Sequence, residues 1–299
     1  MDIERMFPTI ISKLKAKLQS GEMPRVVVAG MGPVGQYTVA KMAPVAREGV
    51  LVSSEYLDSE SISYDSQEHS IHNLDPSSIA KLRKDDDKPM TFVVAKGLGS
   101  SSEEYVENLC KCGAIKDGEI VVMQSNGVDS FSRIQNILDE HEINAKAFQH
   151  LLYVGMVDSP EGPYTSFDKK HVIYTTGKVD ELDGTIKGGV NGYLDTLGLS
   201  KDCLVDYKDG RASAIQKRAN NVRNAADIYA VMNDVSREGF VKGFPTWAVP
   251  FTYGMGEKRE DSNQLALLML KELHHKTGGD LKALKKGSRD YAKGSKHPS

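Results

Sequence analysis

The chain has 299 residues, of which 39% are hydrophobic and 26% charged, so its length fits two domains with buried cores or one large domain. Its net charge of −3 gives no reason to expect binding to nucleic acid or to an anionic membrane, and no apolar run approaches the roughly 18 residues that span a bilayer. The three cysteines cannot all pair with one another, and the N-terminus lacks an apolar signal segment, so we expect a cytoplasmic protein with reduced thiols.

Strand and helix patterns alternate from the N-terminus onward. We predict an amphipathic helix over 5–19 that Pro24 ends, a buried strand over 25–29, a glycine turn over 30–35, a helix to about Val45 and a strand over 49–53. Strand, glycine turn, helix and strand in this order form a βαβ unit of a parallel sheet. The polar stretch 56–72 is predicted to be a loop, with one edge strand within it as the alternative.

The alternation then continues to about residue 210. We predict, in chain order, a helix over 75–82, a strand over 90–95, a helix from a Ser101–Glu104 capping box to Cys112, a strand over 119–123, a helix over 130–141, and antiparallel strands over 151–157 and 171–176. Only helical patterns follow, over 212–235 and 262–275. The predicted fold class is therefore α/β, a Rossmann-type parallel-sheet domain followed by a smaller all-helical C-terminal domain.

The predicted boundaries divide the chain into four parts. They are an N-terminal amphipathic helix extension over 1–22, the Rossmann-type domain over 23–210, the helical domain over 211–277 and a flexible Lys- and Gly-rich tail over 278–299. The helical domain is expected to serve substrate binding or dimerisation.

The strongest local motif is the turn Gly30-Met-Gly32-Pro33-Val34-Gly35, between a strand and a helix. In a dinucleotide-binding turn the first glycine permits the tight turn, the second lets the backbone approach the pyrophosphate, and the third lets the helix pack on the strand. The N-terminus of the helix supplies amides and partial positive charge. We therefore predict that this turn binds a dinucleotide, and the alternative is a glycine-rich turn without a ligand.

The second strand is expected to end at the cofactor ribose. It ends in Ser53-Ser54-Glu55, and Glu55 lies 20 residues after Gly35. An acid at this place accepts a hydrogen bond from the ribose 2′-hydroxyl and repels a 2′-phosphate, which favours NAD. Alternatively, Ser54 and its neighbour hold a phosphate together with Arg47, or Glu55 only caps an exposed strand end.

Two further strands end in polar residues. Lys96 follows the strand over 90–95, and Asn126 follows the strand over 119–123, within Gln124-Ser-Asn-Gly127. Because ligands bind at the carboxyl ends of strands in open parallel sheets, both side chains are expected to face the cofactor. The alternatives are that Asn-Gly forms an ordinary turn and that the lysine is solvated.

The helix over 212–235 carries a polar stripe that begins at Lys217 and continues with Asn221 and Asn224, four and seven residues later. Such a stripe could hold a carbonyl and a carboxylate, whereas Arg218 and Arg223 on the same helix favour a solvated face. No cluster of histidines or cysteines has the spacing of a metal site, so no metal is expected.

Four segments within about residues 25–235 are informative because of the order in which they occur. They are Val28-Ala-Gly-Met-Gly-Pro-Val-Gly35, Val93-Val-Ala-Lys96, Gln124-Ser-Asn126-Gly127 and Gln216-Lys217-Arg-Ala-Asn-Asn221. In this order they resemble the ketopantoate reductase (2-dehydropantoate 2-reductase) family. The resemblance implies that the glycine turn, Lys96 and Asn126 contact a nicotinamide dinucleotide. It also implies that Lys217 protonates the carbonyl oxygen as the general acid and that Asn221 hydrogen-bonds the substrate.

The sequence departs from the family pattern in several places. A helix precedes the first strand, Ser125 is inserted in the Gln-Asn-Gly signature, and the family's second helix asparagine falls on Ala225, next to Asn224. The family's later serine and glutamate substrate contacts have no clear match. The family typically prefers NADP, whereas Glu55 favours NAD, so the expected cofactor is NADP or NAD.

We therefore expect a nicotinamide-dependent reductase that transfers hydride to a small 2-oxo acid resembling ketopantoate. No nucleic-acid or membrane partner is expected, and a homodimer is one assembly that the apolar helices would allow. The alternatives are a reductase of another small carbonyl of the opine or hydroxy-acid type, a non-catalytic dinucleotide sensor, and a dimerisation protein on a decayed enzyme scaffold.

Overall fold

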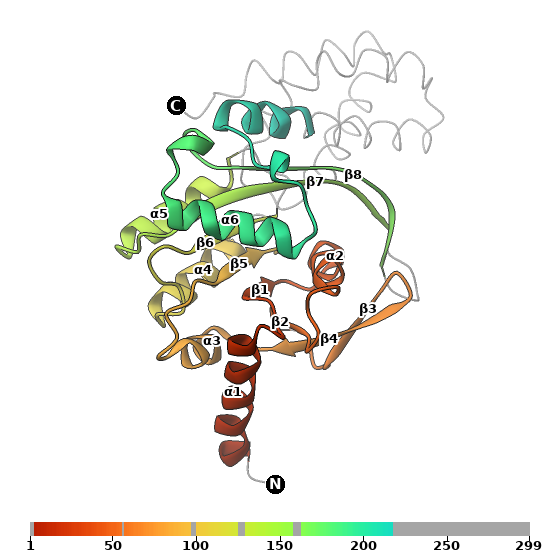
Figure 1. The fold of residues 1–299 in the computed structure, drawn as a ribbon, viewed down its shortest axis with the longest axis vertical. Helices are drawn as coiled ribbons and strands as arrows, with labels where there is room; N and C mark the ends of the chain where they lie inside the picture. Colours follow the sequence, from red (N-terminus) through yellow and green to blue (C-terminus); the bar gives the residue numbers. More distant parts are fainter. Residues whose placement is uncertain (1–2, 56, 97–99, 125–128, 158–162, 218–299) are drawn as a thin grey trace, which may run out of the picture. The chain divides into compact units, whose positions relative to one another are not determined.

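The structure, a computed structural model, describes residues 3–55, 57–96, 100–124, 129–157 and 163–217. The chain divides into two compact units. The first comprises Met1–Lys96, Ser100–Ser125 and Ser130–Gly210, and the second comprises Gly97–Gly99, Asn126–Asp129 and Arg211–Ser299. The first unit is built around one eight-stranded sheet (Figure 1). A helix over 207–217 continues from the first unit into the second.

The sheet has the strand order β3-β4-β2-β1-β5-β6-β7-β8. Its strands are β1 (Val26–Ala29), β2 (Val50–Ser53), β3 (Ser61–Tyr64), β4 (Gln67–Asn73), β5 (Thr91–Val94), β6 (Ile120–Met123), β7 (Lys146–Val157) and β8 (Tyr164–Tyr174). The strands from β4 to β7 are parallel to their neighbours, while β3 and β8 pair antiparallel at the two edges. The inner order is that of a Rossmann sheet, which confirms the predicted fold class for the described part of the chain.

Helices form a layer on each face of the sheet. They are α1 (Ile3–Ser20), α2 (Pro33–Met42), α3 (Pro76–Arg83), α4 (Ser100–Lys111), α5 (Phe131–Glu140) and α6 (Gly184–Thr196), with short 3-10 helices η1 (Val179–Glu181) and η2 (Lys201–Cys203). One core joins α2 and α6 to strand residues such as Val28, Val93 and Phe148. On the other layer α1, α3, α4 and α5 are neighbours in that order. None of the described helices combines the length and apolarity needed to cross a membrane.

The prediction of a loop over 56–72, with one edge strand as the alternative, is wrong, because this stretch contains β3 and all but the last residue of β4. In β3, Ile62 and Tyr64 are buried and alternate with more exposed residues, but in β4 only Ile71 is buried, so the period-2 pattern is too short to identify both strands. Asp65 and Ser66 turn the chain between them at φ values of 54° and 60°. A hairpin turn of this kind is usually signalled by an Asn-Gly pair, which adopts positive φ more readily than Asp-Ser. The turn therefore has no clear signal in the sequence.

Three further element predictions need correction. Gly21, at φ 78°, follows the last residue of α1, so the helix ends before Pro24. Helix α4 begins at Ser100, which places Ser101 inside the helix rather than at its N-cap. Helix α6 was not predicted at all, because its four glycines lower its helix propensity.

The β7–β8 hairpin bends over α2 and reaches the β3–β4 hairpin (Figure 1). The Asp65 amide donates to the Pro163 carbonyl at 2.9 Å, and Tyr64 Oη lies 2.9 Å from Thr165 Oγ1. Register shifts in β7, between Tyr153 and the residue after it and again two residues later, accompany the bend. Helix α2 therefore packs on the sheet on one side and against the hairpin on the other.

Candidate dinucleotide-binding site

The glycine turn connects the carboxyl end of β1 to α2. Gly30 has φ 88°, and a Cβ there would lie 2.9 Å from the Ala95 carbonyl oxygen. A Cβ on Gly35 would lie 1.8 Å from the Gly30 carbonyl oxygen, whereas a Cβ on Gly32 would meet no atom of the described residues within 4 Å. The fold itself thus requires the first and third glycines, while the second faces open space. This is the arrangement that a pyrophosphate close to the backbone needs.

The amino end of α2 is suited to an anion. Gly32 is its N-cap and Pro33 follows, and no side chain of the described residues caps this end or places an acid in its first turn. Gln36 Nε2 donates to the Met31 carbonyl at 2.9 Å and so holds the turn in shape. The amides of Val34 and Gly35 lie in the first helical turn, where the helix dipole favours negative charge. These residues fit the pyrophosphate of a dinucleotide.

Glu55 and Lys96 come together beside the glycine turn. Lys96 Nζ lies 3.6 Å from Glu55 Oε1, and the lysine side chain is 17% exposed against 74% for the glutamate. The ammonium also lies 5.1 Å from the centroid of the Tyr105 ring, and a Cβ on Gly30 would lie 3.0 Å from Lys96 Cγ. Lys96 is thus held over the turn, while the carboxylate of Glu55 stays open to a ligand.

Asn73, which the sequence did not single out, shapes the segment that carries Ser54 and Glu55. Its Oδ1 accepts from the Ser54 amide at 3.0 Å, and its Nδ2 donates to the carbonyls of Ser54 at 2.9 Å and Leu57 at 2.8 Å. Asn73 ends β4, so the same strand-end rule would have found it had β4 been predicted. Arg47 precedes β2, at its amino end, and Ser54 follows the carboxyl end of the same strand, so the structure does not bring these two residues together.

The remaining predicted site residues belong to the second unit. Lys217 is the last described residue of the helix over 207–217, and burial lowers its pKa to about 8. Asn126 and Asn221 lie outside the described residues, so their roles stay predictions. In the first unit the structure brings together Gly30, Gly32, Pro33, Val34, Gly35, Ser54, Glu55 and Lys96.

The described residues offer neither a metal site nor a reactive thiol. Among the described residues, no group of three or more histidines, cysteines or acids could hold a metal ion. Cys110 is buried, which raises its thiol pKa to about 11, and burial also raises the pKa of Cys112. These thiols are therefore poor nucleophiles at neutral pH.

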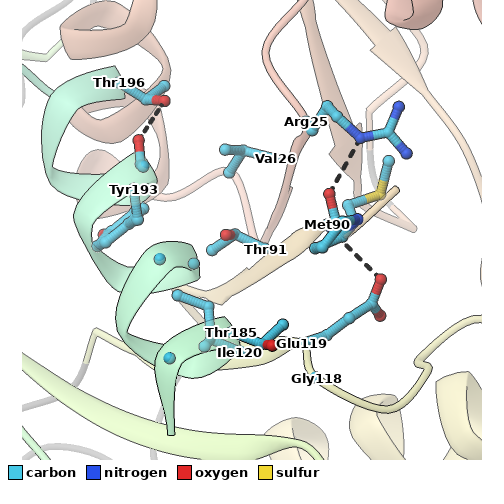
Figure 2. A pocket seen from close by; sticks show the side chains of 15 residues that line it. Arg25, Val26, Met90, Thr91, Gly118, Glu119, Ile120, Thr185, Tyr193 and Thr196 are labelled. Atoms are coloured by element: carbon cyan, nitrogen blue, oxygen red, sulfur yellow. Dashed lines mark hydrogen bonds between the residues drawn. The ribbon is translucent and has the colours of Figure 1, made fainter. Parts of the chain in front are cut away.

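A groove of about 450 Å³ lies at the amino ends of β1, β5 and β6 (Figure 2). The glycine turn follows the carboxyl end of β1, so the groove is at the opposite end of the sheet. It is lined by the first residues of three strands, Val26, Thr91 and Ile120, and by the glycine-rich face of α6. Because ligands of open parallel sheets bind at the carboxyl ends of the strands, we do not assign this groove to the dinucleotide.

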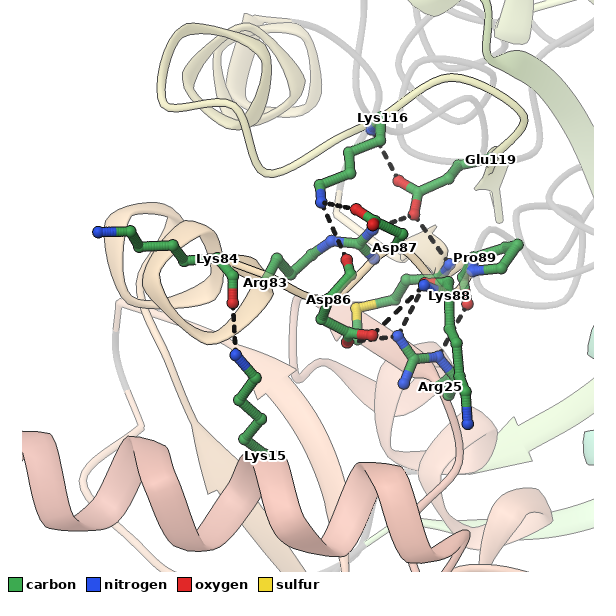
Figure 3. Close-up of polar contacts among 11 residues, drawn as sticks. Lys15, Arg25, Arg83, Lys84, Asp86, Asp87, Lys88, Pro89, Lys116 and Glu119 are labelled. Atoms are coloured by element: carbon green, nitrogen blue, oxygen red, sulfur yellow. Dashed lines mark hydrogen bonds and ion pairs between the residues drawn. The ribbon is translucent and has the colours of Figure 1, made fainter.

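Beside the groove, a network of charges ties the amino ends of β5 and β6 to α3 (Figure 3). Arg83 forms an ion pair with Glu119, and both side chains are 1% exposed. Glu119 also accepts from the amides of Met90 at 2.9 Å and Lys116 at 2.8 Å. Burial raises the pKa of Glu119, although the Arg83 charge and these hydrogen bonds oppose the increase. We interpret the network as structural.

Comparison with known proteins agrees with this fold. No protein-family model matches the chain, and no curated protein matches its sequence. The solved 2-dehydropantoate 2-reductase from Porphyromonas gingivalis W83 aligns with a TM-score of 0.51 and 13% identity, over 91% of this chain and 97% of that one. A protein from Ralstonia solanacearum MolK2, described as a candidate ketopantoate reductase, aligns with a TM-score of 0.52 and 14% identity, over 91% and 98%. The chain has the fold of the ketopantoate reductases.

Proposed function

We propose that the protein is a nicotinamide-dependent reductase that transfers hydride to a small 2-oxo acid. The observation that carries the proposal is the glycine turn, with its uncapped helix end, open space at Gly32, and Glu55 and Lys96 beside it. The shared fold with ketopantoate reductases supports the same class of reaction. The identity of the 2-oxo acid rests on the family resemblance alone.

The residues of the turn hold the cofactor in this proposal. The amides of Val34 and Gly35 bind the pyrophosphate, Glu55 accepts from the ribose, and Lys96 and Asn126 contact the remainder. We further propose a preference for NAD(H), because Glu55 repels a 2′-phosphate and Arg47 lies at the wrong end of β2 to attract one.

The substrate is assigned to residues of the C-terminal part of the chain, over 211–277. When bound, the nicotinamide supplies hydride to the carbonyl carbon of the substrate. Lys217 holds the proton that the carbonyl oxygen takes up, and Asn221 hydrogen-bonds the substrate. A pKa of about 8 keeps Lys217 protonated at neutral pH yet able to donate.

The first experiment measures the melting temperature with NADH and with NADPH, because a ligand of the native state must raise it. We expect a shift with both and a larger one with NADH. Turnover is then followed as loss of NADH absorbance with a panel of 2-oxo acids. Failure of both dinucleotides to raise the melting temperature would refute the proposal.

Lys217→Ala tests the catalytic assignment. We expect it to lower kcat by about 10²–10⁴-fold, because the general acid is lost. The control is Lys208→Ala, which removes an exposed lysine from the same helix and should leave kcat unchanged. Dinucleotide binding without turnover of any 2-oxo acid would instead identify a sensor.

A further inference from the structure

A chain of hydrogen bonds runs through the first unit from the β7–β8 hairpin to α2. Asp168 Oδ1 lies 2.9 Å from His171 Nε2, and His171 Nδ1 lies 3.0 Å from His150 Nε2. From there, His150 Nδ1 lies 2.9 Å from Tyr193 Oη, which accepts from Gln124 Nε2 at 3.1 Å. Gln124 Oε1 in turn accepts from Thr38 Oγ1 at 2.8 Å. His150 and Thr38 are 0% exposed, and the chain is buried except near Asp168.

Both ends of this series of hydrogen bonds contact α2, the helix that begins at the glycine turn. Asp168 Oδ2 lies 2.8 Å from Lys41 Nζ and accepts from Tyr37 Oη at 2.8 Å, and both partners belong to α2. At the other end, Thr38 Oγ1 also lies 2.9 Å from the carbonyl oxygen of Val34, in the first turn of α2. Gln124 directly follows β6 and precedes the predicted cofactor contact Asn126.

The carboxylate of Asp168 sets the direction of every bond in the chain. Burial alone would raise its pKa, but hydrogen bonds from Lys41, Tyr37 and His171 outweigh burial and lower the pKa to about 2. Asp168 is therefore ionised, and His171 Nε2 must donate to it. With both imidazoles neutral, His150 Nε2 then donates to His171, Tyr193 donates to His150, Gln124 donates to Tyr193, and Thr38 donates to Gln124.

One proton taken up by the two histidines reverses the donor and acceptor roles in the hydrogen bonds that link His150, Tyr193, Gln124 and Thr38. Whichever ring carries the charge, His150 Nδ1 becomes a donor and Tyr193 Oη must accept from it. The Tyr193 hydroxyl can then donate to Gln124 Oε1, once that amide has turned by half a rotation, and Gln124 Nε2 donates to Thr38. The Thr38 hydroxyl is left to donate to the Val34 carbonyl alone. Every group keeps a partner in both states, so each is a permitted state of the same fold.

Among the described residues, Tyr37 on α2 and Tyr193 on α6 contact the pair directly, as does Asp168 on β8. Lys41 on α2 pairs with Asp168, and Tyr64 on β3 and Cys203 on η2 lie close enough to Asp168 to feel its charge. Burial raises the pKa values of Tyr37 and Tyr193 well above their usual range, and burial also raises that of Cys203. None of these three therefore ionises near neutral pH, and the two histidines are the groups able to take up the proton.

We propose that His150 and His171 form a proton-binding site that is linked, through Gln124 and Thr38 as positioning residues, to dinucleotide binding at the glycine turn. The link rests on the proposed function of that turn. When Thr38 donates wholly to the Val34 carbonyl, it polarises the peptide bond whose N–H belongs to Gly35. That N–H becomes a stronger donor to pyrophosphate, so protonation of the pair tightens dinucleotide binding.

The first test needs no cofactor. Nitrogen-15 NMR of the full chain between pH 5.5 and 8 reports the protonation of both imidazoles and the environment of the Gln124 side-chain amide. We expect the Gln124 signals to move with the same midpoint as the histidine signals. A Gln124 amide that does not respond while the histidines titrate overturns the proposal, whether or not a dinucleotide binds.

The second test measures the Kd of NADH by fluorescence over the same pH range. We expect binding to be about threefold tighter at pH 5.5 than at pH 8 and to be independent of pH in Thr38→Val, whose histidines still titrate by NMR. The matched control is Thr196→Val, since Thr196 Oγ1 donates to the Gly192 carbonyl at 2.7 Å in the same helical geometry outside the chain. Unchanged pH dependence in Thr38→Val overturns the link. A protein that binds no dinucleotide refutes the proposed function. The NMR titration still decides whether the hydrogen bonds between His150 and Thr38 reverse direction.

Discussion

At the scale of single residues, Glu55 and Lys96 decide how the proposed site treats the ribose. The two charges lie 3.6 Å apart, but Glu55 is 74% exposed, so their attraction is screened by water and worth little. Lys96 is held instead by its packing over Gly30 and by the Tyr105 ring. Glu55 can therefore turn to a ribose without loss of structure.

Glu55→Gln should weaken the preference for NADH over NADPH. We expect the ratio of the two Kd values to change by about tenfold, which corresponds to about 1.4 kcal/mol, because the repulsion of a 2′-phosphate is removed. Calorimetric titration of each dinucleotide measures the ratio. Glu60→Gln, which changes an exposed acid in the same connection, should leave it unaltered. An unchanged ratio in Glu55→Gln means that this carboxylate does not contact the ribose.

The lowered pKa of Lys217 predicts the pH dependence of the reaction. Reduction needs the protonated amine, and a pKa of about 8 means that the ammonium is present below pH 8 and lost above it. We expect kcat for reduction to be level below pH 8 and to fall about tenfold per pH unit above it. In Lys217→Arg the residual activity should stay level to pH 10, since arginine does not lose its proton there. A wild-type rate that rises above pH 8 contradicts the assignment.

At the scale of elements, the turn between β1 and α2 separates the needs of folding from those of binding. A Cβ on Gly35 would clash with the Gly30 carbonyl oxygen, whereas a Cβ on Gly32 would enter open space. Within one turn, glycine is therefore needed for packing at Gly35 and for the proposed ligand binding at Gly32. Substitution of each residue can distinguish the two roles.

Gly35→Ala and Gly32→Ala should behave differently. A Cβ at Gly35 would lie 1.8 Å from backbone, so we expect α2 to move and the free energy of unfolding to fall by about 1–3 kcal/mol. Gly32→Ala should lower the unfolding free energy by no more than about 0.5 kcal/mol. Its Kd for NADH should nevertheless rise at least about tenfold, because the new methyl group occupies the place of the pyrophosphate. Urea unfolding and calorimetry measure the two effects, and unimpaired binding by Gly32→Ala would refute the proposed pose.

The elements that were predicted well are those whose pattern is local. Strands β1, β2, β5 and β6 are buried along their whole length, and each contains at least three consecutive apolar residues that predict a buried strand. Helix α3 has its N-cap in the sequence, where Asp75 accepts from the Ser78 amide at 2.6 Å. Strand β4 and helix α6 lack such local signals and are held by their neighbours, β2 and the sheet core.

At the scale of the whole first unit, stability and binding are placed at opposite ends of the sheet. The carboxyl ends of β1, β2 and β5 carry the candidate site, and the amino ends of β5 and β6 carry the buried ion pair of Arg83 and Glu119. Changes to that pair should therefore affect folding and leave dinucleotide binding intact.

Glu119→Gln should lower the free energy of unfolding by about 3–5 kcal/mol, because it leaves the buried charge of Arg83 uncompensated. Chemical denaturation measures the loss. Glu181→Gln breaks an exposed ion pair with Lys178 and should cause no measurable change. If the Glu119→Gln protein is as stable as the original, the pair does not hold this end of the sheet together.

The order of apolar runs, glycines and strand-end polar residues was enough to predict the Rossmann-type sheet, the glycine turn, and Glu55 and Lys96 as candidate ligands, because these patterns depend on residues adjacent in the chain. Tertiary structure alone placed Asn73 behind Ser54 and folded the β7–β8 hairpin over α2. It also joined His150 on β7, His171 on β8 and Gln124, which follows β6, into one series of hydrogen bonds. Such contacts depend on how distant segments pack, and a buried histidine or glutamine has no sequence pattern that names its partner.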